Sequence, residues 1–258
     1  MKGIILAGGH GTRLFPLTSV LSKHLLPVYD KPMIFYPFSI LLELGIKDIL
    51  VITRKEDINL YKKLFINLNK SRIKINFEIQ ENPNGLPDAF KIGKKFIGQD
   101  DVVLILGDNI FYGNDLLKKI NNAKKNLKKN FSTIFCYRVS DPEKYGVIKL
   151  KKNKISNIIE KPKKFISDMA ITGIYFFKNN VCKFTKNLKK SKRGEFEITD
   201  LLKEYLKIGK LKYDVFENGF AWLDAGSHDS YLQASNFVET IEKRQGIKIA
   251  CPEEIALR

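Results

Sequence analysis

The chain offers its first chemically useful side chains directly after a short apolar run, Ile4 to Leu6. A glycine-rich turn follows it and leads to two cationic groups: Gly8, Gly9, Gly11, Thr12, Arg13 and Lys23. Glycine lets the backbone approach a ligand and turn several N–H groups toward one point. A guanidinium fork and a compact ammonium are the two cationic shapes that suit phosphate. The spacing fits neither GxxxxGK[ST] nor GxGxxG, so the stretch indicates a polyphosphate site of a different kind.

Two carboxylates close apolar runs elsewhere in the chain, Asp108 after VVLILG and Asp224 after FAWL. One such residue alone is more often a helix cap or a turn residue than a ligand. Two of them at the same sheet edge as a polyphosphate loop are what Mg²⁺ requires when it bridges phosphates. Lys161 stands between Glu160 and Pro162, outside the loose lysine runs that decorate the surface.

Alternating helices and strands are expected to position these residues. We expect strands over residues 4–6, 48–53, 73–79, 102–106, 131–138, 145–150, 154–160, 172–177 and 220–224. We expect helices from Lys31-Pro32 to Leu44, over 56–68, up to Phe96, and over 115–127, 198–206 and 229–244. This order predicts an α/β, Rossmann-like fold with a mixed, mostly parallel central sheet, helices on both faces and a small β-rich lobe.

Ligands of such sheets bind outside the carboxyl ends of the strands. Residues 8–13, residues 80–85 and Asp108 all fall at strand ends of this kind, so they are predicted to meet at one crevice. No linker or repeat interrupts the sequence, which favours one domain over residues 1–258 with an inserted lobe.

Composition excludes several classes of protein. The net charge of +17 comes from lysines scattered over segments such as 118–129 and 186–192, without the interleaved aromatics of a nucleic-acid-binding face. The N-terminal apolar run is too short for a signal peptide, and the longest apolar stretch, residues 33–46, is too short to cross a membrane. We therefore expect a cytoplasmic protein. The three cysteines have no metal-like spacing and are predicted to be reduced and buried.

Seven segments together resemble the sugar-nucleotide pyrophosphorylases, over essentially the whole chain and in order. They are GGHGTRL-x(8)-KHLLP, KPMIFYP, LGDNIFYG, EKP, ITGIYFF, RGEFEITD and AWLDAG. Within that family the chain is most similar to the branch that converts dTTP and glucose 1-phosphate into dTDP-glucose and pyrophosphate. The resemblance implies a nucleoside-triphosphate-binding half over about residues 1–110 and a sugar-binding half, with the second metal ligand, over about 111–258.

The resemblance also implies residue roles by position. It places Gly8, Gly9, Gly11, Thr12, Arg13 and Lys23 on the triphosphate, Gln80 and Gly85 on the thymine base, and Mg²⁺ between Asp108 and Asp224. It places Asn109, Tyr145, Gly146, Glu160, Thr172 and Tyr175 around the sugar, and Lys161 on the sugar phosphate with Arg193 nearby. Arg13, Lys23, Lys161 and Arg193 would be the catalytic cations. The family continues beyond CPEEIALR into helices that form a regulatory site and subunit contacts, and we expect that extension to be absent here, while a homo-oligomer, dimer or tetramer, is still expected.

The reaction can be argued without the family. A phosphate monoester has its second pKa near 6, so the attacking oxygen is already anionic at neutral pH and needs no general base. The obstacle is repulsion between two anions, which cations relieve. Three other interpretations remain: a related enzyme that uses UTP or another sugar, a non-catalytic sugar-nucleotide-binding regulator, and a basic nucleic-acid-binding protein.

Overall fold

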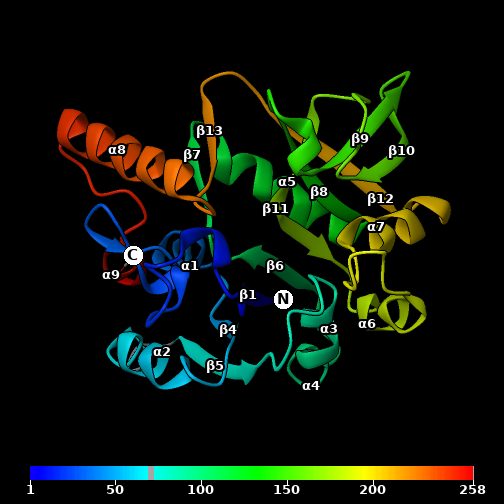
Figure 1. The fold of residues 1–258 in the computed structure, drawn as a ribbon. Coiled ribbons are helices and arrows are strands. Elements are labelled where there is room, and N and C mark those ends of the chain that lie inside the picture. The colour runs from blue at the N-terminus through cyan, green and yellow to red at the C-terminus, as the bar shows by residue number, and fades with distance from the viewer. Residues whose placement is uncertain (69–72, 258) are drawn as a thin grey trace. The chain divides into compact units, whose positions relative to one another are not determined.

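The computed structural model describes residues 1–68 and 73–257, which form two compact units that interleave along the chain. Unit 1 contains residues 1–83, 105–113 and 221–258, and unit 2 contains residues 84–104 and 114–220 (Figure 1). The single domain expected from the sequence stays a prediction. The interleaving matters for the site, because Asp108 and Asp224 belong to unit 1 although 116 positions of sequence separate them.

Unit 1 is built on parallel strands β1 (Lys2–Ala7), β4 (Asp48–Thr53) and β5 (Lys74–Ile79). Ile5 pairs with Val51, and Val51 pairs with Phe77 on its other side. β1 and β4 are apolar and buried along most of their length, as is typical of parallel strands covered on both faces. Their carboxyl ends present residues 8–13 and 54–57 at one edge.

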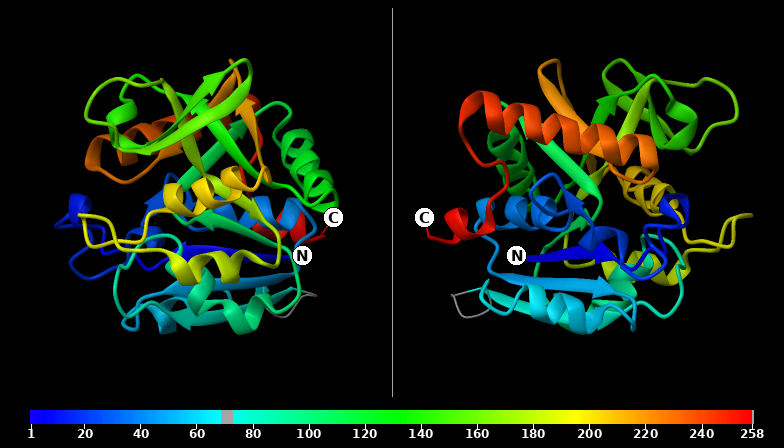
Figure 2. Two further views of the ribbon diagram at one scale, coloured as in Figure 1. Left: turned by 90° about the vertical axis from the view of Figure 1, so that its right-hand side faces the viewer. Right: turned by 60° about the vertical axis from the view of Figure 1, so that its left-hand side comes forward.

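The described residues of this unit form the α-helices α1 (Phe35–Glu43), α2 (Ile58–Leu64), α8 (His228–Gln245) and α9 (Pro252–Leu257). α9 packs against α1, as both views of Figure 2 show. A second, two-stranded sheet joins β7 (Asn109–Gly113) to β13 (Phe220–Asp224). A buried cluster that includes Tyr36, Ile110 and Val238 connects α1, β7 and α8.

The expected helix start at Lys31-Pro32 is wrong. β2 (Pro27–Val28) and β3 (Lys31–Pro32) form a short hairpin, and α1 begins only at Phe35. The Met33 amide donates to the Leu26 carbonyl (2.9 Å) and the Ile34 amide to the His24 carbonyl (2.9 Å), so this segment supports the preceding loop. Pro37 instead occupies the first turn of α1, where no amide donor is lost.

Unit 2 contains strands β8 (Ser132–Arg138), β9 (Gly146–Lys151), β10 (Lys154–Glu160), β11 (Met169–Phe177) and β12 (Leu211–Phe216). β12 pairs parallel with β8, while the β8–β11, β11–β9 and β9–β10 pairs are antiparallel. Its helices are α3 (Asp88–Ile92), α4 (Lys94–Ile97), α5 (Leu116–Lys128), α6 (Val181–Phe184) and α7 (Ile198–Lys207). The chain passes from unit 2 to unit 1 within β6 (Val102–Leu106).

The predicted fold class, α/β with a mixed, mostly parallel sheet flanked by helices, is confirmed. The helix expected up to Phe96 is broken in two at Gly93, and the helix expected over 56–68 ends at Leu64 because the chain turns at Phe65. The expectation of three buried cysteines holds for Cys136, whereas Cys182 and Cys251 are partly exposed. In the described part of the chain, no helix has both the length and the hydropathy needed to cross a membrane.

Candidate active site

The loop after β1 needs glycine for steric reasons. A Cβ on Gly8 would overlap the side-chain oxygen of Gln80, so the two residues are packed directly together. Gly11 has φ +65°, and a Cβ there would lie 2.9 Å from the Thr18 methyl group. The Gly11 carbonyl accepts from the Leu14 amide (2.8 Å) and from the Thr18 hydroxyl (2.9 Å), which closes the turn. The loop is therefore a fixed shape, as an anion-binding turn requires.

This turn leaves its polar side chains exposed. Thr12 and Arg13, in a 3₁₀ turn over Thr12–Leu14, are both exposed, whereas Leu14 is buried beneath them. The Arg13 guanidinium lies 2.7 Å, and an Asp224 carboxylate oxygen 2.9 Å, from the position that a Cβ of Gly226 would occupy. Arg13 and Asp224 thus flank the same glycine, and any larger residue at 226 would push them apart.

Lys23 forms an ion pair with Asp108 in unit 1, across 85 residues of sequence. Both side chains are largely buried, at 12% and 13% exposure. Burial alone would raise the pKa of Asp108, but the Lys23 ammonium and a hydrogen bond from Asn109 hold the pKa of this carboxyl below its usual range. Asp108 is consequently a carboxylate at any physiological pH.

His24 lies directly behind this pair. Its ring is buried, packs against Gly107 and accepts or donates a hydrogen bond at Ser22 Oγ (3.2 Å), which in turn meets the Tyr61 hydroxyl (3.0 Å). Burial, followed by the positive charge of Lys23, lowers the pKa of His24 to about 3. His24 is therefore a neutral packing residue at the base of the loop, and sequence reasoning had no signal for it.

The two predicted metal ligands lie on neighbouring chain segments. The Ala225 amide donates to the Asp108 carbonyl (3.1 Å), so Asp224 and Asp108 flank a backbone contact between the ends of β13 and β6. Among residues 1–68 and 73–257 no group of three or more His, Cys, Asp or Glu side chains is arranged to hold a metal. Two carboxylates fit Mg²⁺ nonetheless, because this ion takes one or two carboxylates and completes its shell with substrate phosphates and water.

Unit 2 carries the remaining predicted residues, and its Gly85 and Gly146 are also required for steric reasons. Gly85 has φ +101°, and a Cβ there would collide with the Phe196 carbonyl. The Phe196 amide donates to the neighbouring Asn84 carbonyl (2.7 Å). A Cβ on Gly146 would lie 2.7 Å from the Thr199 methyl group and 3.2 Å from a Glu160 carboxylate oxygen.

Glu160 is the predicted carboxylate of unit 2, and its side chain is fixed by a hydrogen bond. It accepts from the Thr199 hydroxyl (3.0 Å), and burial, followed by the Glu197 charge, raises the pKa of its carboxyl. The next residue, Lys161, is exposed, and its amide donates to the Tyr145 carbonyl (3.0 Å). Lys161 has φ +40°, a conformation that costs a non-glycine residue about 1–3 kcal/mol and that clusters at functional sites.

Arg193 lies among three glutamates. Its guanidinium is 3.5 Å from Glu160, 3.5 Å from Glu195 and 3.6 Å from Glu197. Sequence reasoning placed Arg193 near the sugar phosphate but did not identify Glu197, which is buried and precedes α7. The alternating glutamates of RGEFEITD were the available signal.

Thr172 and Tyr175 lie inside β11 rather than on an open surface. The Thr172 hydroxyl is fully buried and donates to the Phe135 carbonyl (3.1 Å). Tyr175 is 3% exposed and its ring stacks on Phe177. Both side chains have the surroundings of core residues.

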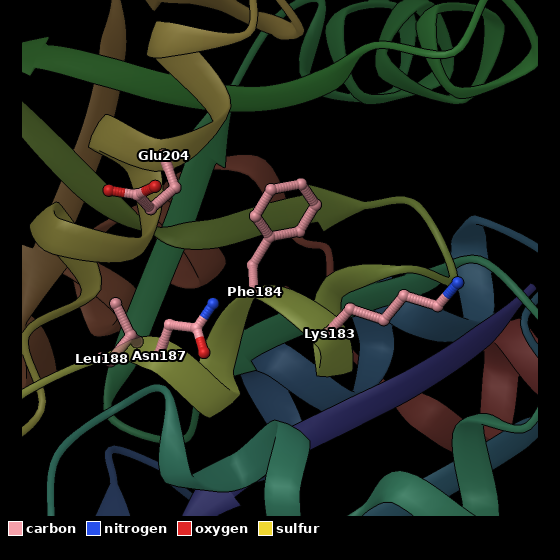
Figure 3. Close-up of a pocket in the computed structure, with 5 residues that line it drawn as sticks. All are labelled: Lys183, Phe184, Asn187, Leu188 and Glu204. Carbon is pink, nitrogen blue, oxygen red and sulfur yellow. The ribbon is translucent and has the colours of Figure 1, made fainter.

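A hollow of about 320 Å³ lies elsewhere in unit 2, and Figure 3 shows its lining. Lys183, Phe184, Asn187, Leu188 and Glu204 form its walls. None of the predicted site residues contributes to it, and Glu204 is already paired with Lys207 (2.6 Å). It is separate from the candidate active site.

Residues 2–241 match the model of the nucleotidyl transferase family, and the chain therefore belongs to that family. It is 49% identical to the glucose-1-phosphate thymidylyltransferase of Neisseria meningitidis serogroup A, over all of this chain and 89% of that one. It is 47% identical to the enzyme of the same name from Mycolicibacterium smegmatis, with the same coverage. The family resemblance predicted from the sequence is confirmed.

Two solved structures share the fold. A Bacillus anthracis protein, provisionally assigned as a glucose-1-phosphate thymidylyltransferase and solved with sucrose, superposes with a TM-score of 0.84 at 39% identity. The alignment covers 92% of this chain and 94% of that one. A UDP-glucose pyrophosphorylase in complex with UDP-glucose gives a TM-score of 0.81 at 25% identity, over 93% and 98% of the two chains.

Proposed function

We propose that this protein is a Mg²⁺-dependent nucleotidyltransferase that joins dTTP and α-D-glucose 1-phosphate to give dTDP-glucose and pyrophosphate. The observation that carries the proposal is the grouping in unit 1 of a rigid glycine turn, the exposed Arg13, the Lys23–Asp108 pair and Asp224. Backbone donors, two cations and two carboxylates are the set that a metal-bound triphosphate needs. The relatives of 45–49% identity that are named glucose-1-phosphate thymidylyltransferases support the choice of substrates.

In unit 1 the triphosphate would lie along the turn. Gly8, Gly9, Gly11 and Thr12 would direct backbone donors at its oxygens, and Arg13 and Lys23 would neutralise them. Gln80, packed against Gly8, would offer its amide to the imide edge of thymine, which a group with both donor and acceptor complements. Gly85 is the second residue that we propose for contact with the base.

Asp108 and Asp224 would hold Mg²⁺. When bound there, the ion would neutralise charge on the triphosphate and on the leaving pyrophosphate. The protein's contribution at Asp108 is to keep the carboxylate ionised: its pKa lies below the usual range because Lys23 lies beside it and offsets the effect of burial.

In unit 2 the glucose hydroxyls would be held by Glu160, Tyr145 and Gly146. Glu160 is oriented by Thr199 and so has one oxygen already fixed. Thr172 and Tyr175 are buried in β11, so they would support the sugar-binding residues by packing and would not contact the sugar. Lys161 would bind the sugar phosphate, with Arg193 beside it, because Lys161 is exposed at a strand end in a conformation that the fold maintains at a cost.

The reaction is in-line attack of a glucose 1-phosphate oxygen on the α-phosphorus of dTTP. The new P–O bond forms as the α,β-bridging P–O bond breaks, and the electron pair leaves on pyrophosphate. No proton has to move, since a phosphate monoester is already largely dianionic at neutral pH. Catalysis is therefore positioning and charge neutralisation, with Lys161 on the nucleophile and Arg13 and Lys23 on the leaving group.

The experiment is a pyrophosphate-release assay with dTTP and UTP, each against several sugar 1-phosphates. We expect dTTP with glucose 1-phosphate to give the highest kcat/KM. A preference for UTP would reassign the protein to a related uridylyltransferase, an alternative favoured by the UDP-glucose pyrophosphorylase of the same fold. No turnover with any pair would leave a binding protein and end the proposal. We also expect a homo-oligomer, which light scattering would measure.

Lys161→Ala tests the proposed nucleophile contact. Losing one charged hydrogen bond should lower kcat/KM by roughly 10- to 200-fold, the equivalent of about 1.5–3 kcal/mol. Lys163→Ala is the matched control, since Lys163 is exposed two residues further along the same segment. Equal activity of the two variants would remove Lys161 from the site.

A further inference from the structure

Three side chains of unit 1 form a hydrogen-bonded series that ends on Asp108. The Trp222 indole N–H donates to Asn109 Oδ1 (2.7 Å), and Asn109 Nδ2 donates to Asp108 Oδ1 (3.0 Å). Lys23 binds the other carboxylate oxygen of Asp108. Each oxygen of the carboxylate therefore has one fixed donor from within the unit.

The direction of the series is set by the tryptophan. An indole N–H can only donate, so the amide oxygen of Asn109 must face Trp222 and the amide NH₂ group must face Asp108. The indole donor therefore favours the orientation of the amide in which its NH₂ group faces Asp108. Trp222 thus acts on Asp108 through Asn109 and not by a hydrogen bond of its own to Asp108.

The backbone holds the series in register. Asn109 begins β7 and Trp222 lies in β13, and these two strands pair with each other. Asn109 is only 2% exposed, so its polar groups lie in surroundings where an unmade hydrogen bond is costly. The Ala225 amide, three residues after Trp222, binds the Asp108 carbonyl (3.1 Å) and closes the same segment.

We propose that Trp222 is a positioning residue for the metal site: it acts through Asn109 to orient the Asp108 carboxylate toward a divalent cation. This inference rests on the proposed function, which makes Asp108 a metal ligand. Groups that orient metal ligands commonly change metal affinity by about 10–100-fold when they are removed. Lys23 and Asn109 each donate to one oxygen of Asp108, and since a carboxylate has about four acceptor directions, the proposal assigns others of these to the cation.

The experiment titrates Mn²⁺ into the full chain by calorimetry, without nucleotide or sugar, for the wild type and four variants. Trp222→Phe removes the indole donor and keeps an aromatic ring, and Asn109→Leu replaces the amide with an apolar group of similar shape. The double variant tests whether both act on one path. Tyr112→Phe is the matched control, because Tyr112 lies in the same strand β7 and donates to Gln245 (3.0 Å) away from Asp108.

We expect Trp222→Phe and Asn109→Leu each to weaken Mn²⁺ binding by roughly tenfold or more. Because Trp222 acts through Asn109, the double variant should bind no more weakly than Asn109→Leu alone. Tyr112→Phe should match the wild type. Unchanged Mn²⁺ affinity in Trp222→Phe, full additivity in the double variant, or no Mn²⁺ binding by the wild type would each overturn the inference.

The chain supplies its own optical reporter, since Trp222 is its only tryptophan. Binding of Mg²⁺ at Asp108 should change the fluorescence of the wild type, and this response should be lost in Asn109→Leu. An equal response in both proteins would contradict the series. Turnover is measured separately. If Trp222→Phe and Asn109→Leu weaken Mn²⁺ binding but the wild type shows no turnover, the proposed function alone is overturned. If the wild type turns over but the two variants bind Mn²⁺ as it does, only this inference is overturned.

Discussion

Two lysines of unit 1, eight residues apart in the sequence, are both withdrawn from water into ion pairs, yet their surroundings differ. Lys31 is 9% exposed and binds Asp30 (2.6 Å) and Glu242 (2.9 Å). Glu242 also accepts from Lys248 (2.9 Å) and from the Ile249 amide (2.9 Å), so both of its oxygens are occupied. Lys23 pairs with Asp108 and packs against Gly9 and Gly11 of the glycine turn, near the second carboxylate, Asp224.

The difference separates a structural ion pair from a binding one. The Lys31–Glu242 pair joins the β2–β3 hairpin to α8 and the segment after it, with every charge satisfied by the protein. A buried pair of this kind adds little net stability over apolar residues, but removing one partner is costly. The Lys23–Asp108 pair has acceptor and donor capacity left over, so a metal-bound phosphate can join it without an unpaired charge being created.

The largest effect that this contrast predicts is on turnover. Asp108→Asn removes the negative charge and keeps the shape, so it should lower kcat by about 10²–10³-fold or more, as loss of a charge-stabilising group in the transition state does. Pyrophosphate release measures this, with circular dichroism to show that the variant is folded. Turnover close to that of the wild type would mean that the Lys23–Asp108 pair is a structural ion pair, as the Lys31–Glu242 pair is.

Glu242→Gln should have the opposite effect: it should lower the stability of the fold and leave turnover unchanged. Lys31 would keep the partly exposed Asp30 but lose its buried charge partner, at a cost of about 1.5–3 kcal/mol in the free energy of unfolding. Molecules that remain folded should turn over as the wild type does. Denaturant unfolding measures the loss of stability, and kcat at low temperature measures the turnover of the folded molecules.

Glu239→Gln is the control for that variant, because Glu239 lies one turn earlier on α8 and pairs with the exposed Lys243 (2.6 Å). It should leave stability unchanged. If Glu242→Gln lowered kcat without lowering stability, the division between structural and binding pairs would be wrong.

Part of this organisation was accessible from the sequence. Residues 48–53 and 102–106 form strands with the expected bounds, because apolar runs that end at Gly, Asp or a polar turn indicate buried strands. β7 was not predicted, since it starts immediately after Asp108 and has no pattern that separates it from the preceding strand. The hairpin at Lys31-Pro32 has no signal in the sequence, because its strand pairs with Pro27–Val28 and the next residues, Met33 and Ile34, bind Leu26 and His24 through backbone groups alone.

The site shows the same limit. The glycine turn and the two aspartates stand out by residue type, so they could be proposed from the sequence. The contacts among these residues could not be predicted from the sequence. Lys23 and Asp108 are 85 residues apart, and nothing in the sequence distinguishes Trp222 from the other apolar residues of its strand, although its N–H binds Asn109. Residue types identify the chemistry, whereas only the fold shows which group orients which.

A smaller effect follows from His24, which lies behind the Lys23–Asp108 pair. Burial, with Lys23 next, lowers the pKa of its imidazole to about 3 in the folded protein, from 6.5 as the ordinary value. The unfolded chain therefore binds more protons between these values, so stability is full above pH 6.5 and is lost as the pH falls. The loss between pH 7 and pH 5 should be about 2 kcal/mol.

Denaturant unfolding at a series of pH values measures this, with His24→Gln for comparison. The glutamine does not titrate, so its curve should be offset from the wild type but flatter over this pH range. Parallel curves would show that other groups, and not His24, cause the dependence.

The smallest effect concerns Lys248, the outer member of the Lys31 network. It is 48% exposed and binds Asp30 (2.5 Å) and Glu242 (2.9 Å) at the surface, while Lys31 holds the same two carboxylates from inside. Since exposed ion pairs contribute little, Lys248→Met should lower Tm by only about 1–2 °C. The difference should vanish in 1 M NaCl, where the screening length is only about 3 Å. Thermal melts at low and high salt measure both points. A drop as large as that of Glu242→Gln, or one that persists in salt, would mean that the buried pair depends on its exposed partner.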